Sequence, residues 1–149
     1  MLIDLGTLNG SADSIGYGIN SFGDVVGYSG PDAFFYSNGV MTGLGAGVAF
    51  GINDSGQVVG GSNFGAFLYR NGMMADLNTM KDPTRGIQLQ TATGINDRGQ
   101  IIVNGVDANG NVAAFLLTPE SLSIPEPSVP LLIAGGLSAL AMLHHKRSR

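Results

Sequence analysis

The sequence of 149 residues contains no cysteine, and residues 1–124 contain no histidine. Without cysteine the chain has no disulfides, no thiolate metal sites and no cysteine nucleophiles, although an oxidising compartment remains compatible with it. Without histidine, residues 1–124 lack the commonest general acid or base of hydrolytic and transfer enzymes. No other cluster of acids, bases and nucleophiles stands out. We therefore predict a non-enzymatic protein without a cofactor.

Charged side chains are also scarce, at 12% of the residues, and they are unevenly distributed. Residues 1–124 contain four basic and ten acidic side chains, whereas residues 125–149 contain three basic and one acidic. An acidic body without a Lys/Arg cluster offers little to phosphate groups, on which nucleic-acid affinity largely depends. We therefore expect no nucleic-acid partner.

Glycine, by contrast, is abundant, with 24 residues. Together with the few charges, it favours many short strands and tight turns over long solvent-facing helices. The tripeptide Gly-Ile-Asn occurs at residues 18–20, 51–53 and 94–96, with spacings of 33 and 43 residues. Each copy is followed by a turn and a β-branched pair, at residues 25–26, 58–59 and 101–102. This pattern predicts a repeated strand, turn and strand.

The second half of each unit starts with an Ala-Phe pair, at residues 33–34, 66–67 and 114–115. In the first two units an Asn-Gly pair follows, at residues 38–39 and 71–72, and Asn-Gly favours the positive φ of hairpin turns. Further apolar stretches then occupy residues 40–44 and 73–77. The sequence thus predicts units of four short antiparallel strands, with core residues that include Ile19, Val25 and Phe34.

The third unit has no fourth apolar stretch, because Leu117 leads directly into Thr118-Pro119. Met1–Leu5 matches the missing element and is expected to complete the last sheet, as the first strand does when a β-propeller closes. Propellers usually have about four to eight blades, more than the three units found here. We therefore predict an all-β fold of propeller-like, four-stranded repeats over residues 1–118, either an incomplete ring or part of a longer array.

The repeat is similar to the HAF family of bacterial extracellular repeats, in which a Gly-Ile-Asn-x-x-Gly-x-Val-Val-Gly segment precedes a His-Ala-Phe triplet. The first segment matches at residues 18–27 and 51–60, whereas Val103 replaces its final glycine in the third copy. The family histidine is replaced in all three copies, by Asp32, Gly65 and Ala113. The resemblance implies a surface location and a packing role for the Ala-Phe pairs, without an active site.

Near the C-terminus, residues 129–143 read VPLLIAGGLSALAML, carry no charge and are followed by the basic end HHKRSR. As a helix this segment would be roughly 22 Å long, short for a hydrocarbon core of roughly 30 Å. The alternative of a buried core helix is disfavoured because Pro130 and Gly135-Gly136 weaken a helix and there is no polar face. Basic residues after an apolar segment tend to stay cytoplasmic. Residues 129–149 are therefore predicted to be a short transmembrane helix with a basic cytoplasmic tail, in which His144 and His145 are interfacial residues.

A linker over residues 119–128 precedes this segment, and its Ile124-Pro125-Glu126-Pro127-Ser128 stretch is rigid and extended because proline fixes φ. Pro-Glu-Pro, a short apolar segment and a basic end, in this order, closely resemble the PEP-CTERM sorting signal of Gram-negative bacteria that make extracellular polysaccharide. The resemblance implies that Pro125, Glu126 and Pro127 are recognised by an exosortase, a membrane enzyme that removes the tail. It also implies a protein that is first anchored in the inner membrane and is then released to the cell surface or outside the cell.

Proteins with such a signal are expected to begin with a secretory signal peptide, which needs a basic region and a sustained apolar run. Residues 1–6 have neither. Since the repeat is also out of phase at this end, we expect further N-terminal sequence in a longer reading frame. A decayed gene copy is the alternative.

The sequence leaves two kinds of function open for the body. As a passive surface or matrix component, its repeats would serve stability and display. As a binding module, it would hold extracellular polysaccharide on exposed aromatics such as Tyr17, Phe22 and Tyr28. A propeller-type enzyme is a weaker third alternative, since no cluster of residues supports it.

The loop at residues 107–111, Asp-Ala-Asn-Gly-Asn, spaces oxygen ligands in a way that hard-cation loops also use. No glutamate closes it, and Asp, Asn and Gly are ordinary residues of hairpin turns. We therefore predict a turn there and not a calcium site, and the same holds at Asp54 and Asp97.

Overall fold

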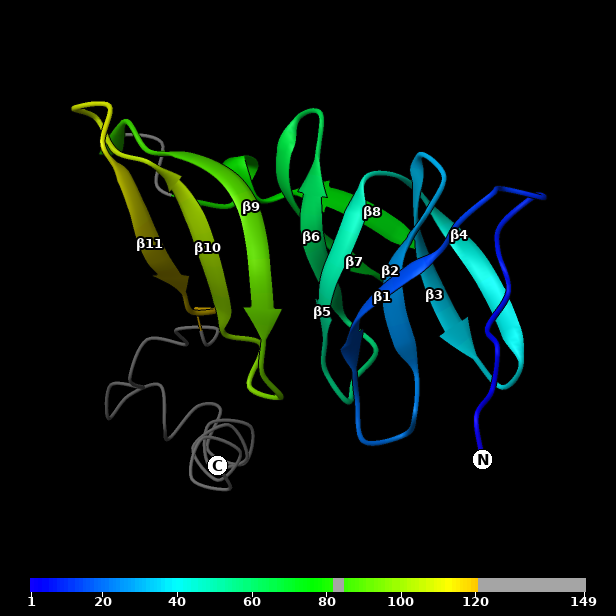
Figure 1. The fold of residues 1–149 in the computed structure, drawn as a ribbon. Coiled ribbons are helices and arrows are strands. Elements are labelled where there is room, and N and C mark those ends of the chain that lie inside the picture. The colour runs from blue at the N-terminus through cyan, green and yellow to red at the C-terminus, as the bar shows by residue number, and fades with distance from the viewer. Residues whose placement is uncertain (82–84, 121–149) are drawn as a thin grey trace, which may run out of the picture. The chain divides into compact units, whose positions relative to one another are not determined.

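The computed structural model describes residues 1–81 and 85–120, of which residues 1–119 form one compact unit. This unit consists of antiparallel sheets (Figure 1), so the predicted all-β class is confirmed for the described residues. The first sheet contains β1 (Ile15–Ile19), β2 (Val25–Ser29), β3 (Asp32–Ser37) and β4 (Val40–Ala46). The second contains β5 (Val48–Ile52), β6 (Val58–Ser62), β7 (Gly65–Arg70) and β8 (Met73–Asp76), and the third β9 (Gln88–Ile95), β10 (Ile101–Val106) and β11 (Val112–Leu117). A one-turn 3-10 helix, η1 (Leu77–Thr79), follows β8.

Each sheet corresponds to one unit of the sequence repeat. Every Gly-Ile-Asn tripeptide lies at the end of the first strand of its sheet, that is β1, β5 or β9. The strands of each sheet then pair in chain order, so each unit is a simple meander. The first two units have the four predicted strands, whereas the third has three among the described residues.

The predicted hairpin turns between the third and fourth strands are present in the first two sheets. Asn38 and Gly39 have φ of 50° and 82°, and Asn71 and Gly72 have φ of 52° and 78°. Positive φ at both central residues is the geometry of a type I′ turn, whose twist matches the twist of the flanking strands. The Asn-Gly pairs therefore fix the register of these two hairpins.

The three sheets are stacked, and the second sheet is buried on both faces. β1 and β2 contact β5, while β6 and β7 contact β9. Side chains alternate along each strand, so Val58 packs toward the first sheet and Val59 toward the third. Phe67 and Leu68 divide in the same way. Two separate cores result, one on each side of the second sheet.

Neighbouring sheets are closest at their first strands, where the glycines of Gly-Ile-Asn meet backbone. A Cβ on Gly18 would lie 2.9 Å from the carbonyl oxygen of Phe50, and a Cβ on Gly51 would lie 3.2 Å from the Cα of Gly94. At the fourth strands, large side chains such as Leu44 and Met74 separate the first sheet from the second. The repeated glycine is thus required by the approach of one unit to the next.

The prediction for the core is right for Phe34, which is 1% exposed, and wrong for Ile19, which is 69% exposed. Val25 is half-buried. The equivalents of Ile19 are Ile52 and Ile95, which pack against the preceding sheet. Ile19 is exposed because no sheet precedes the first one among the described residues.

The N-terminal segment differs from the prediction as well. Met1–Leu5 forms no strand and does not pair with the third sheet. The segment that follows lies on the first sheet: Leu8 is 8% exposed and its amide donates to Ser29 Oγ at 2.9 Å. The expected closure of the last sheet by the first residues of the same chain is therefore wrong, because the segment is held at the opposite end of the stack.

The third copy also tolerates Val103 at a position where the first two copies have Gly27 and Gly60. In the second sheet, a Cβ on Gly60 would overlap the carbonyl oxygen of Val48. In the third sheet the register of β9 and β10 shifts a second time, between Asn104 and Gly105. The close approach to β9 then falls on Gly105, whose Cβ would overlap the carbonyl oxygen of Gln88, and Val103 is free to fill the core.

We expect Gly60→Ala to lower the free energy of unfolding by about 2–3 kcal/mol, because the new methyl group also meets the Phe67 ring, 2.7 Å from its Cζ. Urea denaturation would measure the change. Gly16→Ala is the matched control, since its Cβ would meet only Val25 Cγ1 at 3.4 Å, an ordinary contact. Equal stabilities of the two variants would contradict this account of the repeat.

Candidate functional site

The first strands of the three sheets lie side by side and present one edge each (Figure 1). Each is interrupted by a β-bulge at the residue before Gly-Ile-Asn, namely Tyr17, Phe50 or Thr93. A bulge leaves one residue unpaired, redirects its side chain and makes the edge a poor template for further strand pairing. The three bulged residues therefore occupy equivalent positions along one face of the stack.

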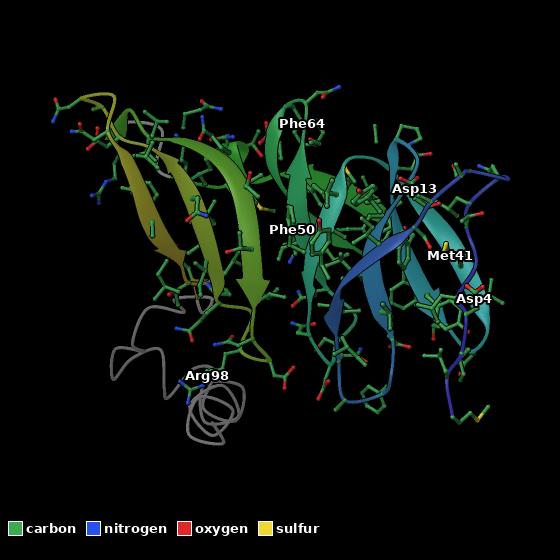
Figure 2. All side chains as sticks on the ribbon, viewed as in Figure 1. Asp4, Asp13, Met41, Phe50, Phe64 and Arg98 are labelled. Carbon is green, nitrogen blue, oxygen red and sulfur yellow. The ribbon has the colours of Figure 1, made fainter. Side chains whose placement is uncertain are left out.

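Two of these bulged residues form a cluster with a third aromatic side chain. The rings of Tyr17 and Phe50 lie 4.9 Å apart at 53°, and those of Tyr17 and Tyr28 lie 6.2 Å apart at 27°. Tyr17 is 51% exposed, and the other two are half-buried. Figure 2 labels Phe50 on β5, between β1 and β9. We call Tyr17, Tyr28 and Phe50 the aromatic cluster.

The structure thus brings together two of the three aromatics that the sequence suggested. Phe22 does not join them: it lies in the turn between β1 and β2 and is 74% exposed. Phe50 was missed because a single aromatic residue within an apolar run gives no sign of its direction. Its place directly before Gly-Ile-Asn, shared with Tyr17, is the signal that relates the two positions.

The turns after the three first strands are joined by a ladder of asparagines. Asn20 Nδ2 donates to the carbonyl oxygen of Asn53 at 3.2 Å, and Asn53 Nδ2 donates to that of Asn96 at 3.0 Å. Within each turn the asparagine Oδ1 accepts from two backbone amides, as in Asn53 with Ser55 and Gln57. Asn53 is 3% exposed, and its side chain is fully hydrogen-bonded. The third residue of Gly-Ile-Asn therefore both shapes a turn and ties it to the next unit.

A second ladder runs beside the first and involves aspartates. Asp54 Oδ1 accepts from the amide of Ser21 at 2.8 Å, and Asp97 Oδ1 accepts from the amide of Asp54 at 2.8 Å. Ser21 Oγ also donates to Asp54 Oδ2 at 2.6 Å. The two bonds from Ser21, the hydroxyl first and the amide second, lower the pKa of Asp54 below its usual value. Asp54 and Asp97 thus have structural roles in turns, as predicted.

The loop at residues 107–111 is a turn of the same kind. Asp107 Oδ1 accepts from the amides of Asn109 and Asn111 at 2.8 and 2.9 Å. These hydrogen bonds, above all the one from Asn111, lower the pKa of Asp107. A cation in this loop would need the Asp107 carboxylate as a ligand, but Oδ1 of that carboxylate already accepts hydrogen bonds from two backbone amides. Within residues 1–81 and 85–120, no three Asp, Glu or His side chains are grouped as metal ligands.

The sequence-predicted sorting residues Pro125, Glu126 and Pro127 lie outside the described residues, and so do His144 and His145. The same holds for the apolar segment at residues 129–143. In the part of the chain that is described, no helix is long and apolar enough to cross a membrane.

Comparison with known proteins finds no match to the chain among family models, curated proteins or solved structures.

We expect Asp54 to make stability depend on pH in the acid range. Because its pKa is lower in the folded protein, its contribution is complete above the unfolded value of about 3.9 and is lost as the pH falls through the folded value. Asp54→Asn should therefore lose less stability than the unmodified protein between about pH 5 and pH 2. Urea denaturation across this range would measure it.

Ser21→Ala provides the control, because it removes the hydroxyl that contributes most to the lowered pKa and leaves the carboxylate in place. It should flatten the pH profile in the same direction. If both variants keep the full acid loss, the ladder contact does not affect the titration of Asp54.

Proposed function

We propose that the chain is a non-enzymatic repeat protein that is exported and then sorted through its C-terminal segment to the cell surface or the extracellular matrix. The observation on which this rests is the order of three elements in residues 124–149: Pro-Glu-Pro, a short uncharged apolar segment and a basic end. An exosortase-type enzyme is the proposed partner for Pro125, Glu126 and Pro127. Before processing, the apolar segment anchors the protein in the inner membrane.

The fold of the body supports this proposal in a general way. Its sheets are held by apolar contacts and by ladders between turns, and the asparagines and aspartates of these ladders are used for structure. Such an architecture suits stability and display. The approach of the sheets at their first strands also supports the interpretation as part of a propeller-like array of the HAF type, in which first strands surround an axis.

For the sorting signal, we expect the native host to cleave the protein after the Pro-Glu-Pro region. The Glu126→Ala variant should not be cleaved, because it lacks a residue of the proposed recognition motif. Intact-mass spectra of membrane and extracellular fractions would measure both chain ends at once. Ser128→Ala is the matched control and should be processed normally. A full-length species confined to the cytosol would overturn the proposal.

The aromatic cluster favours a second candidate function, binding of extracellular polysaccharide. Aromatic rings offer apolar faces to the C–H faces of sugar rings, while the tyrosine hydroxyls offer hydrogen bonds at the rim. Tyr17 is the exposed member, and its ring packs against those of Phe50 and Tyr28. This arrangement differs from a single exposed aromatic such as Phe22, because the Tyr17 ring is held in place by its neighbours.

We expect Tyr17→Ala to weaken retention of the host polysaccharide roughly tenfold, the equivalent of about 1.4 kcal/mol. Affinity electrophoresis in gels containing that polysaccharide would measure it. Phe22→Ala, at an aromatic residue that is even more exposed, should have no effect. Equal losses in the two variants, or no retention of the unmodified protein, would leave only the passive role.

A further inference from the structure

Among the described residues, the third sheet has three strands, whereas the other two sheets have four. β3 pairs with β4 and β7 pairs with β8, whereas among the described residues β11 pairs only with β10. The consequence is visible at the phenylalanine of the Ala-Phe pair. Phe34 and Phe67 are 1% and 0% exposed, but Phe115 is only half-buried. Within residues 1–81 and 85–120, one edge of β11 therefore has no partner strand, and one side of the core beside it is uncovered.

Met1–Leu5 has the sequence of the missing strand. It reads Met-Leu-Ile-Asp-Leu, against Met-Met-Ala-Asp-Leu in Met73–Leu77, with identity at the first, fourth and fifth positions. The turn that follows is also the same. Asp4 Oδ1 accepts from the amide two residues on, that of Gly6, at 3.0 Å, as Asp76 Oδ1 accepts from Asn78 at 2.8 Å. Met1–Leu5 is therefore followed by the same turn as a fourth strand, but it pairs with no sheet in the described structure.

The apolar side chains of this segment are exposed to solvent. Met1, Leu2 and Ile3 are 114%, 98% and 59% exposed. In the second sheet the equivalent of Leu2 is Met74, which packs against the core between the first two sheets. Consecutive exposed apolar side chains of this kind are uncommon on a protein surface, and they often mark a site of interaction.

Within one chain, Met1–Leu5 and β11 lie too far apart to pair. Leu8 is bonded to Ser29, and Ser14 Oγ donates to the carbonyl oxygen of Gly6 at 2.6 Å, so the N-terminal segment is held on the first sheet. The third sheet lies on the other side of the second sheet. Figure 1 shows the N-terminus and β11 at opposite ends of the stack.

We propose that Met1–Leu5 of one copy of the chain pairs with β11 of a second copy as its antiparallel fourth strand. Addition of a strand to an open edge supplies main-chain hydrogen bonds, and the side chains that enter the core supply specificity. The register follows from β7 and β8, in which Phe67 is opposite Asp76 and Leu68 is opposite Ala75. The same register places Asp4 opposite Phe115 and Ile3 opposite Leu116.

The faces of the end sheets fit the same head-to-tail contact. The far face of the third sheet exposes Ile102 and Leu116, which are 51% and 63% exposed, whereas the equivalent Val59 and Leu68 are buried against the next sheet. The first sheet exposes Ile19, whose equivalents are packed. The two apolar faces would cover each other in the assembly.

The ladder of turns would continue across the same contact. Among the described residues, Asn96 Nδ2 donates only within its own turn, to Gln100, and a Cβ on Gly94 would meet only the Ile102 side chain, at 3.9 Å. In the copy that supplies Met1–Leu5, the carbonyl oxygen of Asn20 is equivalent to those of Asn53 and Asn96, which accept the hydrogen bonds of the ladder. This inference concerns assembly and does not depend on the proposed sorting or glycan binding.

The absence of cysteine allows a direct test by disulfide cross-linking. Full-length Ile3→Cys chains are mixed with isotopically labelled Leu116→Cys chains under mild oxidation, and the masses of the products are measured. Residues directly opposite in an antiparallel pair have Cβ atoms about 4.5–5.5 Å apart, close enough for a disulfide. We expect a mixed species of twice the chain mass of 15.3 kDa.

The control is Ala114→Cys, on the same strand and face as Leu116 but two residues out of register, where the mixed species should be lost. Equal cross-linking of the two positions, or no mixed species, would overturn the proposal. So would a disulfide that forms only within single chains of an Ile3→Cys, Leu116→Cys double variant.

Sedimentation gives a second test without cysteines. Unmodified protein should associate with rising concentration, and Leu2→Glu should stay monomeric, because the charge would be buried beside Leu117. Leu2 is 98% exposed in the single chain, so this variant should fold normally. Val40→Glu, at an exposed residue of β4, should associate as the unmodified protein does. Association that survives Leu2→Glu would show that other surfaces drive it.

Discussion

The close approach of backbone to backbone at the first strands is the constraint on which the rest of the structure depends. Because Gly18 and Gly51 have no side chain, β1, β5 and β9 come near enough for the turns beyond them to share hydrogen bonds. That closeness also fixes which residues of one sheet face the next. The second sheet consequently receives a core on each side, and its strands are apolar at nearly every position.

The same constraint explains why the repeat has the sequence that it has. Glycine permits the approach, isoleucine packs against the preceding sheet, and asparagine shapes the turn and ties it to the following one. Phe67 and Phe115 point toward the preceding sheet, and Phe67 lies over Gly60. In a stack of this type, each unit is stabilised by its contacts with its neighbours. The end units therefore have one apolar face that no neighbouring unit covers.

Much of the fold could be predicted from the sequence because the repeat marks each strand with local chemistry. Asn-Gly pairs determine their own turns, and β-branched pairs alternate with glycines in a way that only strands accommodate. The predictions that were wrong concern the two ends of the stack of sheets. The exposure of Ile19 and the position of Met1–Leu5 depend on which neighbour is present, and no local pattern records that. Two residues of the aromatic cluster, Tyr17 and Tyr28, were predicted. Phe50 was not, because its direction is decided by a bulge, which is a property of strand pairing and not of composition.

The unequal spacing of the repeats has a consequence for how such a protein can change. The step of 43 residues, against 33, is accommodated mainly between the end of β8 at Asp76 and the start of β9 at Gln88, whereas β4 and β5 are separated by Gly47 alone. The connection joins β9 at its first residue, Gln88, whereas the asparagine ladder lies beyond the other end of that strand, at Asn96. Residues can therefore be gained or lost there at little thermodynamic cost, since loop-closure entropy grows slowly with length. Units of one array are free to diverge in length while their stacking contacts stay the same.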